Sequence, residues 1–213
     1  MDSLPPMLRG VLVLAGIVLL FGSVFAIVAL VTYVERAQRA SALAPYAAAR
    51  GMRPVSTGET LRPSWESPLL SVLATHASVT GTFDGLRVEV LLSSMRRGWR
   101  RMSVVAQRPR ALSGAGIGAY RSTSRAGTFS AGAPPPPTFS GRFKLSGPPA
   151  LVARVFDEDV QQAVVSFPRD LDMVWLDGSI AGMQWLENDP VDPAVVDSAL
   201  QTICTLCARA DAQ

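Results

Sequence analysis

The chain begins with an uncharged apolar segment that is compatible with very few structures. The residues from Gly10 to Val34 include no charged side chain, although Arg9 and Glu35 bound the segment on either side. A helix rises about 1.5 Å per residue, so this segment is long enough to cross a hydrocarbon core of about 30 Å. Only a helix can satisfy its own backbone hydrogen bonds inside a single-pass membrane segment. The sequence therefore predicts a short tail at 1–9 and one transmembrane helix at 10–34, with the lipid bilayer as its partner.

A cleaved signal peptide is the competing interpretation of this segment. The triplet Ala42-Leu43-Ala44 has the small residues of a cleavage site. A signal peptide, however, has an apolar core of about 7 to 15 residues, and here Glu35, Arg36 and Arg39 separate the core from the triplet. An uncleaved anchor is therefore favoured. Gly22 and Ala26 form a small-xxx-small pair, which would allow a homo-oligomer through the anchor, although such pairs often arise by chance.

The arginines that flank the anchor bear on its orientation. Arg9 precedes the segment, and an excess of arginine follows it: Arg36, Arg39, Arg50 and Arg53. Positive residues accumulate on the cytoplasmic side of membrane segments. The sequence favours a C-terminal domain in the cytoplasm, and a signal anchor that exports the domain is the alternative.

The rest of the chain has the length of a single domain. We expect a helical stalk at 35–51 and one soluble domain at 52–213, with a Gly/Pro-rich loop at about 108–137. Charge is unevenly distributed, because residues 51–150 hold 13 basic and 4 acidic side chains, whereas residues 151–213 hold 3 and 11. The two halves either form separate surfaces or attract each other within one fold.

Alternating apolar residues and turn dipeptides predict the elements of the domain. Asp84-Gly85 and Asp177-Gly178 each suit the tight turn of a β-hairpin. Asp192 can cap a final helix that begins at Pro193. The predicted class is α+β with a largely antiparallel sheet and a C-terminal helix. The expected elements are strands at 79–83, 86–92, 99–106 and 138–146, one or two short helices at 148–167, and a hairpin at 172–176 and 180–186.

The order of these segments resembles bacterial single-pass membrane-anchored domain families with no assigned activity. The resemblance covers about residues 45–210. It includes a stalk that ends in Arg50-Gly51, the segment 139–143 (Phe-Ser-Gly-Arg-Phe), and the hairpin from Trp175 to Trp185. It implies the same architecture and a location in a bacterial inner membrane, and it implies no reaction.

Two short motifs could suggest a cofactor or a metal. Residues 114–119 have the spacing G-x-G-x-x-A of a dinucleotide-binding turn, but such a turn must join a strand to the start of a helix, and a flexible loop is favoured here. Cys204 and Cys207 lie inside the predicted last helix, and one histidine, His76, is too few to complete a zinc site. We therefore expect buried cysteines and no cofactor.

Acidic residues offer no clear catalytic site either. Asp157, Glu158 and Asp159 precede a predicted helix, where carboxylates stabilise the positive helix N-terminus. Asp170 and Asp172 follow and could form paired carboxylates or a metal site with them. His76 has no evident catalytic partner, and the chain contains no G-x-S-x-G motif. An enzyme is therefore the less favoured class.

The candidate functional surface is a run of arginines around a tryptophan, which we call the basic segment: Arg96, Arg97, Trp99, Arg100 and Arg101. Arginine beside an aromatic ring can bind anionic lipid head groups or an acidic protein surface, and an ordinary solvated turn is the alternative. Nucleic acid is less favoured, because the chain has no recognisable nucleic-acid-binding fold. The sequence supports a membrane-tethered, non-enzymatic interaction domain, with a membrane-anchored hydrolase or transferase as the alternative.

Overall fold

The computed structural model describes residues 6–55, 60–61, 76–94, 100–111, 116–121, 138–139, 141–187 and 191–212. The chain forms two compact units, Met1–Gln38 and Arg39–Gln213, which are considered separately below. We refer to the second unit as the domain.

The first unit consists of the greater part of helix α1, which runs from Pro6 to Arg50. Its most apolar window has a mean hydropathy of 2.8, and none of that window is buried. The hydroxyl groups of Ser23 and Thr32 donate to carbonyl oxygens of the preceding turn, so the helix itself satisfies these polar groups. By length and composition, this helix is a candidate membrane span, as the uncharged segment predicts.

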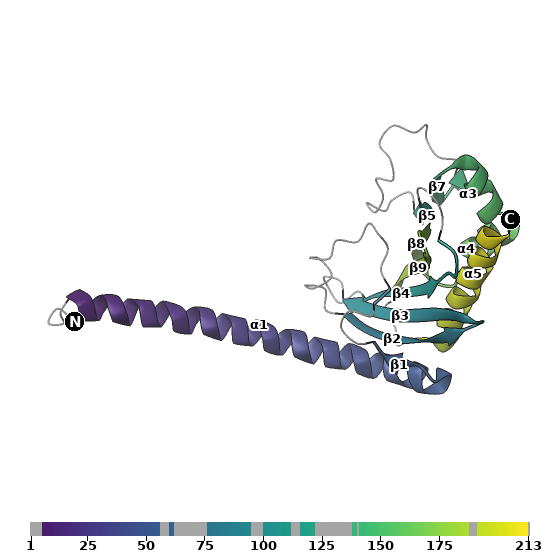
Figure 1. Cartoon of the computed structure of the whole chain (residues 1–213). Helices are drawn as coiled ribbons and strands as arrows, with labels where there is room; N and C mark the ends of the chain where they lie inside the picture. Colours follow the sequence, from purple (N-terminus) through teal and green to yellow (C-terminus); the bar gives the residue numbers. More distant parts are fainter. Residues whose placement is uncertain are drawn as a thin grey trace. The chain divides into compact units, whose positions relative to one another are not determined.

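The domain is built on a nine-stranded antiparallel sheet with the strand order β1-β2-β3-β4-β9-β8-β5-β7-β6 (Figure 1). The predicted α+β class with an antiparallel sheet is confirmed. The strands are β1 (Arg53–Pro54), β2 (His76–Phe83), β3 (Leu86–Ser94), β4 (Arg100–Gln107), β5 (Ile117–Arg121), β6 (Thr138–Phe139), β7 (Phe143–Ser146), β8 (Asp170–Asp177) and β9 (Ile180–Glu187).

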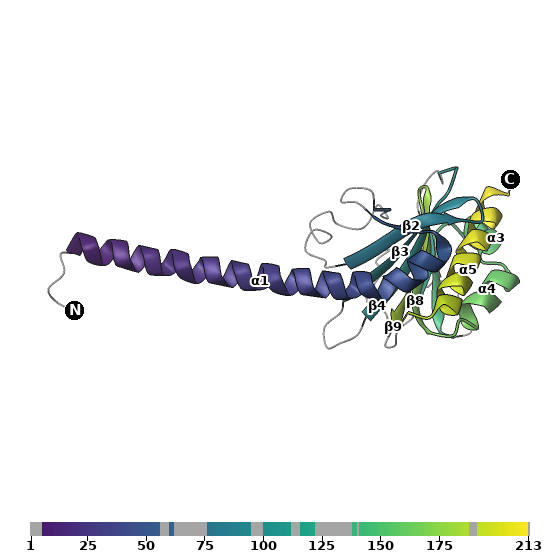
Figure 2. The same ribbon diagram turned by 90° about the horizontal axis from the view of Figure 1, so that it is seen from below.

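Among the described residues, the helices α3 (Pro149–Val155), α4 (Glu158–Val165) and α5 (Pro193–Asp211) lie on one side of this sheet (Figure 2). The Asp157 side chain accepts a hydrogen bond from the Val160 N–H and caps α4. Asp192 caps α5 in the same way through the Ala194 N–H, and Pro193 occupies the first turn. The predicted start of the last helix is confirmed.

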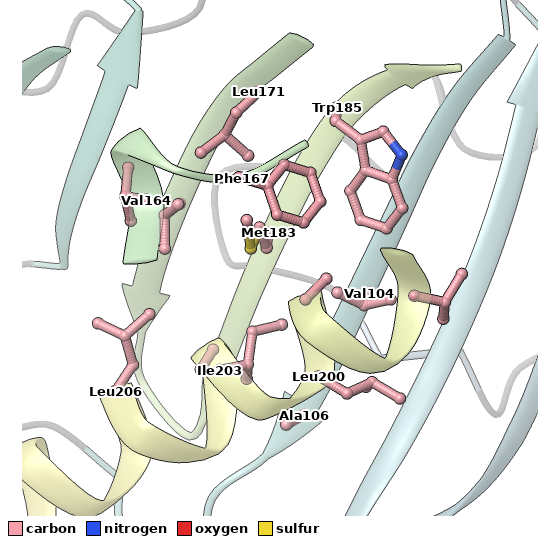
Figure 3. Packing of buried hydrophobic residues seen from close by; sticks show 14 of the residues in the cluster. Val104, Ala106, Val164, Phe167, Leu171, Met183, Trp185, Leu200, Ile203 and Leu206 are labelled. Carbon is pink, nitrogen blue, oxygen red and sulfur yellow. The ribbon is translucent and has the colours of Figure 1, made fainter. Parts of the chain in front are cut away.

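The main core lies between this face of the sheet and α5. Leu200, Ile203 and Leu206 of α5 belong to the same buried cluster as Met183 and Trp185 of β9 (Figure 3). These side chains are fully buried. Burying a large apolar side chain stabilises a fold by about 1.5–3 kcal/mol, so the apolar face of α5 is a principal source of the stability of the domain.

The last turns of α1 belong to the domain and not to a separate stalk. Leu43, Tyr46 and Ala47 are buried in the main core. The Tyr46 hydroxyl donates to Asp197 of α5 at 3.0 Å, and the Arg50 guanidinium pairs with the same carboxylate. The division of the chain therefore falls after Gln38, whereas the sequence suggested a stalk at 35–51.

A smaller apolar cluster covers part of the opposite face of the sheet. Leu61 packs there with Val105, Met173 and Trp175. Its backbone N–H donates to the fully buried carboxylate of Glu89 at 2.7 Å. Gly182 is needed beneath the Trp175 ring, because a Cβ at that position would lie 2.2 Å from the ring atom Cζ2.

Both predicted hairpins are present. β2 and β3 meet at Asp84-Gly85, where both residues have positive φ, and β8 and β9 meet at Asp177-Gly178. β4 extends the first hairpin into the predicted meander.

Two expectations for the middle of the chain were wrong. Residues within the expected loop at 108–137 form β5, because Ile117 and Ala119 are buried and the strand pairs with both β7 and β8. The expected strand at 138–146 is a hairpin of β6 and β7, because Gly141 adopts positive φ and turns the chain. Stacking of Phe139 on Phe143, at 5.2 Å between ring centroids, closes that hairpin.

Candidate partner surface

The described part of the basic segment lies at the start of β4. Arg100 is exposed, and Arg101 is partly exposed with its Nη2 3.9 Å from a carboxylate oxygen of Asp172. The other three members, Arg96, Arg97 and Trp99, lie outside the described residues. The segment is therefore anchored at one end to a central strand of the sheet.

The neighbouring strand ends contain further ion pairs. The strand register places Arg100 opposite Glu187, and Arg101 opposite Leu186. Glu187 is buried and accepts hydrogen bonds from Arg169 at 3.2 Å and from the Trp185 indole N–H at 3.1 Å.

Asp170 and Asp172 have a structural role at this end of the sheet. Asp170 pairs with Arg121 of β5, and Asp172 faces Arg101. The other acids named with them, Asp157 and Asp159, pair instead with Arg209 of α5, at 2.9 and 3.1 Å. Each of these carboxylates thus faces an arginine, and the described residues include no group of three or more potential ligands that could hold a metal ion.

Arg108 follows β4 but does not extend the basic segment. Its side chain is buried, and it donates to Asp211 Oδ1 at 2.5 Å and to the Gly178 carbonyl at 3.4 Å. Its backbone N–H donates to the Ser179 carbonyl at 2.7 Å. Arg108 therefore ties the end of α5 to the β8–β9 turn.

Cys204 and Cys207 are free and buried on the inner side of α5. Burial raises the pKa of the Cys204 thiol to about 11 and that of Cys207 to about 12, so both are protonated at neutral pH. Their predicted burial is confirmed. Catalytic cysteines have the opposite property, a lowered pKa.

The glycine-rich turn motif also has a structural explanation. Gly118 lies within β5, where a Cβ would approach the Val174 carbonyl oxygen of the paired strand to 3.0 Å. The described end of the motif is a strand and not the start of a helix, so it lacks the geometry of a dinucleotide-binding turn.

A groove between α4 and α5 was not predicted from the sequence. It has a volume of about 380 Å³ and is lined by Asp159, Val160, Ala163, Ser166, Phe167, Ser198, Gln201, Thr202 and Thr205. The α5 members recur at i, i+3, i+4 and i+7, so they form a polar stripe beside the apolar face of that helix. This periodicity is visible in the sequence, but it does not reveal which helix faces the stripe.

Comparison with known proteins gives a likeness of fold. No protein-family model and no curated protein matches the chain. Among solved structures, the fold is similar to that in the crystal structure of the mycobacterial trehalose monomycolate transport factor A, TtfA, with a TM-score of 0.54. Sequence identity is 13%, and the alignment covers 83% of this chain and 94% of that chain. At this identity, the similarity shows a common fold.

Proposed function

We propose that this chain is a membrane-tethered accessory factor without a catalytic role, and that its basic segment contacts anionic lipid head groups at the membrane surface. The observation that carries this proposal is the short connection between the apolar helix and the domain. The uncharged segment ends at Val34, and the domain begins at Arg39. Five residue steps span at most about 18 Å even when fully extended. The anchor therefore keeps the first residues of the domain close to the head groups.

The charges of the basic segment suit this setting. An arginine near an anionic leaflet contributes about 1 kcal/mol, and this attraction falls off within a Debye length of about 8–10 Å at physiological salt. Four arginines that come within this distance of the leaflet would therefore act together. Arg100 is exposed and Arg101 is partly exposed, which supports such a contact.

The similar fold supports an accessory role in transport. TtfA is described as a mycobacterial trehalose monomycolate transport factor. We extend only the class of role to this chain: it would assist transport at a bacterial inner membrane, with its domain on the cytoplasmic side. The arginine excess after the anchor supports that side.

Energy transfer from the basic segment to the lipid surface tests the proposal. The full chain is placed in nanodiscs, a donor fluorophore is attached at Gly98→Cys, and acceptor-labelled lipid head groups are included. A second label at Gln107→Cys reports on the opposite, exposed end of β4. Cys204 and Cys207 should remain unlabelled at pH 7, because their thiols are buried and protonated.

We expect transfer from position 98 to increase when phosphatidylglycerol replaces phosphatidylcholine, and to decrease again as salt is added. Transfer from position 107 should change less. Equal transfer in both lipids at low salt would contradict the lipid contact. If a purified membrane protein changes the fluorescence of the label at position 98 equally in both lipids, the result would instead indicate an acidic protein partner.

A further inference from the structure

The groove between α4 and α5 has the chemical character of a ligand site, and its lining includes neither Arg100 nor Arg101 of the basic segment. Its volume of about 380 Å³ falls within the range of ordinary ligand pockets, about 300–1,000 Å³. α4 supplies one wall, and the polar stripe of α5 supplies the other.

The apolar part of the groove comes from α4 and the residues that follow it. Ala163 is partly exposed there, whereas Val160 and Phe167 lie behind it and are almost fully buried, and Phe167 makes an edge-to-face contact with Trp185, at 5.3 Å between ring centroids (Figure 3). The small apolar surface at Ala163 and at the edge of Phe167 can accept the C–H face of a ligand.

The polar part carries hydroxyl and amide groups in defined orientations. The Thr202 hydroxyl donates to the Ser198 carbonyl at 2.9 Å, and the Thr205 hydroxyl donates to the Gln201 carbonyl at 3.0 Å. A hydroxyl that donates within its own helix keeps its oxygen lone pairs as acceptors. Gln201 is exposed and adds an amide, which provides both donors and an acceptor.

The charges at the groove argue against an ionic ligand. No lysine, arginine or histidine is among the described residues that line it. Its one carboxylate, that of Asp159, already faces Arg209 Nη2 at 3.1 Å. An anion would therefore meet no dedicated cation, and a metal cation would have to compete with Arg209.

A purely apolar ligand is disfavoured for a different reason. It would cover the exposed amide of Gln201 without returning a hydrogen bond, and burying such a group without a partner costs about 1–3 kcal/mol. The acceptor lone pairs of Thr202 and Thr205 would also remain unused. A ligand that suits both walls has many hydroxyl groups, no net charge and a C–H face.

The geometry points to a binding site for a neutral polyhydroxylated ligand, such as a sugar or the sugar head group of a glycolipid, between α4 and α5. Hydroxyl groups of the ligand donate to Thr202 and Thr205 and exchange hydrogen bonds with Gln201. The C–H face of the ligand lies toward Ala163 and the accessible edge of Phe167.

Methyl NMR on the full chain in phosphatidylcholine nanodiscs tests this site. The threonine methyl groups are labelled with ¹³C, and maltose and trehalose are added separately up to about 10 mM, ten times the Kd of a weak specific site. We expect the methyl signals of Thr202 and Thr205 to shift in a saturable way. The signal of Thr82, which is exposed on β2, should not move.

Variants of the exposed rim identify the contacts. Gln201→Leu combined with Thr205→Val should weaken sugar binding by at least roughly fivefold, since each lost hydrogen bond contributes about 0.5–1.5 kcal/mol. Thr82→Val, the matched control, should leave the affinity unchanged. Thermal unfolding of each variant establishes that it is folded.

The result that would overturn the site is the absence of saturable shifts at Thr202 and Thr205 with either sugar. Stronger binding of glucose 6-phosphate or of octanol than of the neutral sugars would also overturn it, because these probes represent anionic and apolar ligands. The lipid is uncharged in this experiment, so the outcome is independent of the proposed contact between the basic segment and anionic head groups.

Discussion

The Tyr46 hydroxyl donates a hydrogen bond of 3.0 Å to the carboxylate of Asp197, and this contact joins the end of α1 to the second turn of α5. Arg50 pairs with the same carboxylate, and its guanidinium lies 5.8 Å from the centroid of the Tyr46 ring. The phenol is buried, and this burial raises the pKa of Tyr46. The chain that leaves the apolar segment is thus fixed directly to the helix that forms the core of the domain.

Removal of this contact should destabilise the domain. Tyr46→Phe keeps the ring and should lower the free energy of unfolding by about 1 kcal/mol, whereas Asp197→Ala should cost about 2 kcal/mol because two donors lose their acceptor. Urea unfolding of the full chain in detergent, followed by tryptophan fluorescence, measures both values. Gln162→Ala, at an exposed position inside α4, serves as the control and should stay within about 0.5 kcal/mol. A cost for Asp197→Ala no greater than this control would show that the contact contributes nothing.

The buried Arg108 should be sensitive to the loss of its acidic partner. Asp211→Ala leaves the buried guanidinium with the Gly178 carbonyl as an acceptor, and we expect a loss of about 2–3 kcal/mol. Adding Arg108→Met should restore part of this stability, because the uncompensated charge is then replaced by an apolar side chain of similar length. Chemical unfolding of the two single variants and the double variant forms a mutant cycle. A double variant less stable than Asp211→Ala alone would contradict this account.

The two cysteines predict a specific pH dependence. Burial raises the pKa of both thiols from 9.0 to about 11 and about 12, so between these values the folded protein binds more protons than the unfolded chain. Their contribution to stability is therefore constant below about pH 9 and is lost as the pH rises through the folded pKa values.

Comparison with Cys204→Ala/Cys207→Ala isolates this effect. At pH 7 the double variant should be less stable by up to a few kcal/mol, as expected for loss of buried volume. The difference in unfolding free energy between the unsubstituted chain and the double variant should decrease between pH 9 and pH 10.5, as measured by urea unfolding. A stability difference that is independent of pH, or stoichiometric zinc in the purified protein that the double variant lacks, would contradict the packing role.

The orientation of the chain is tested by a reporter fused after Gln213. We expect a reporter that functions only in the cytoplasm to show activity, because more arginines follow the apolar segment than precede it. If a reporter that functions only after export shows activity when it is fused at the same position, the domain lies outside the cytoplasm. Such a result would also place Cys204 and Cys207 in a compartment where disulfides form.

Local signals in the sequence were sufficient for much of the fold. Asp84-Gly85 and Asp177-Gly178 supply the positive φ that tight hairpins need, and Asp192-Pro193 marks the start of α5. These features act over a few residues, so they can be recognised without knowledge of the tertiary structure.

Features that depend on distant partners were not predictable. β5 was interpreted as loop because glycines surround Ile117, and its burial depends on pairing with β8, more than fifty positions later. The end of α1 resembled an exposed stalk, since nothing near Tyr46 in the sequence indicates Asp197. The groove arises because the polar stripe of α5 faces α4, and only the packing of the two helices creates it.

The central claim is that the basic segment contacts anionic lipid, and the most direct measurement compares two sets of arginine substitutions in the nanodisc energy-transfer experiment. The first set is Arg96→Gln, Arg97→Gln, Arg100→Gln and Arg101→Gln. The second set removes the same charge from exposed positions elsewhere in the domain: Arg87→Gln, Arg110→Gln, Arg142→Gln and Arg154→Gln.

Both sets lower the net charge equally, so only a local contact can distinguish them. We expect the first set to abolish the phosphatidylglycerol-dependent increase in transfer from position 98, because four contributions of about 1 kcal/mol are lost. The second set should retain most of the increase. Equal effects of the two sets, or an unchanged increase in the first, would contradict the account and leave the basic segment as a solvated turn.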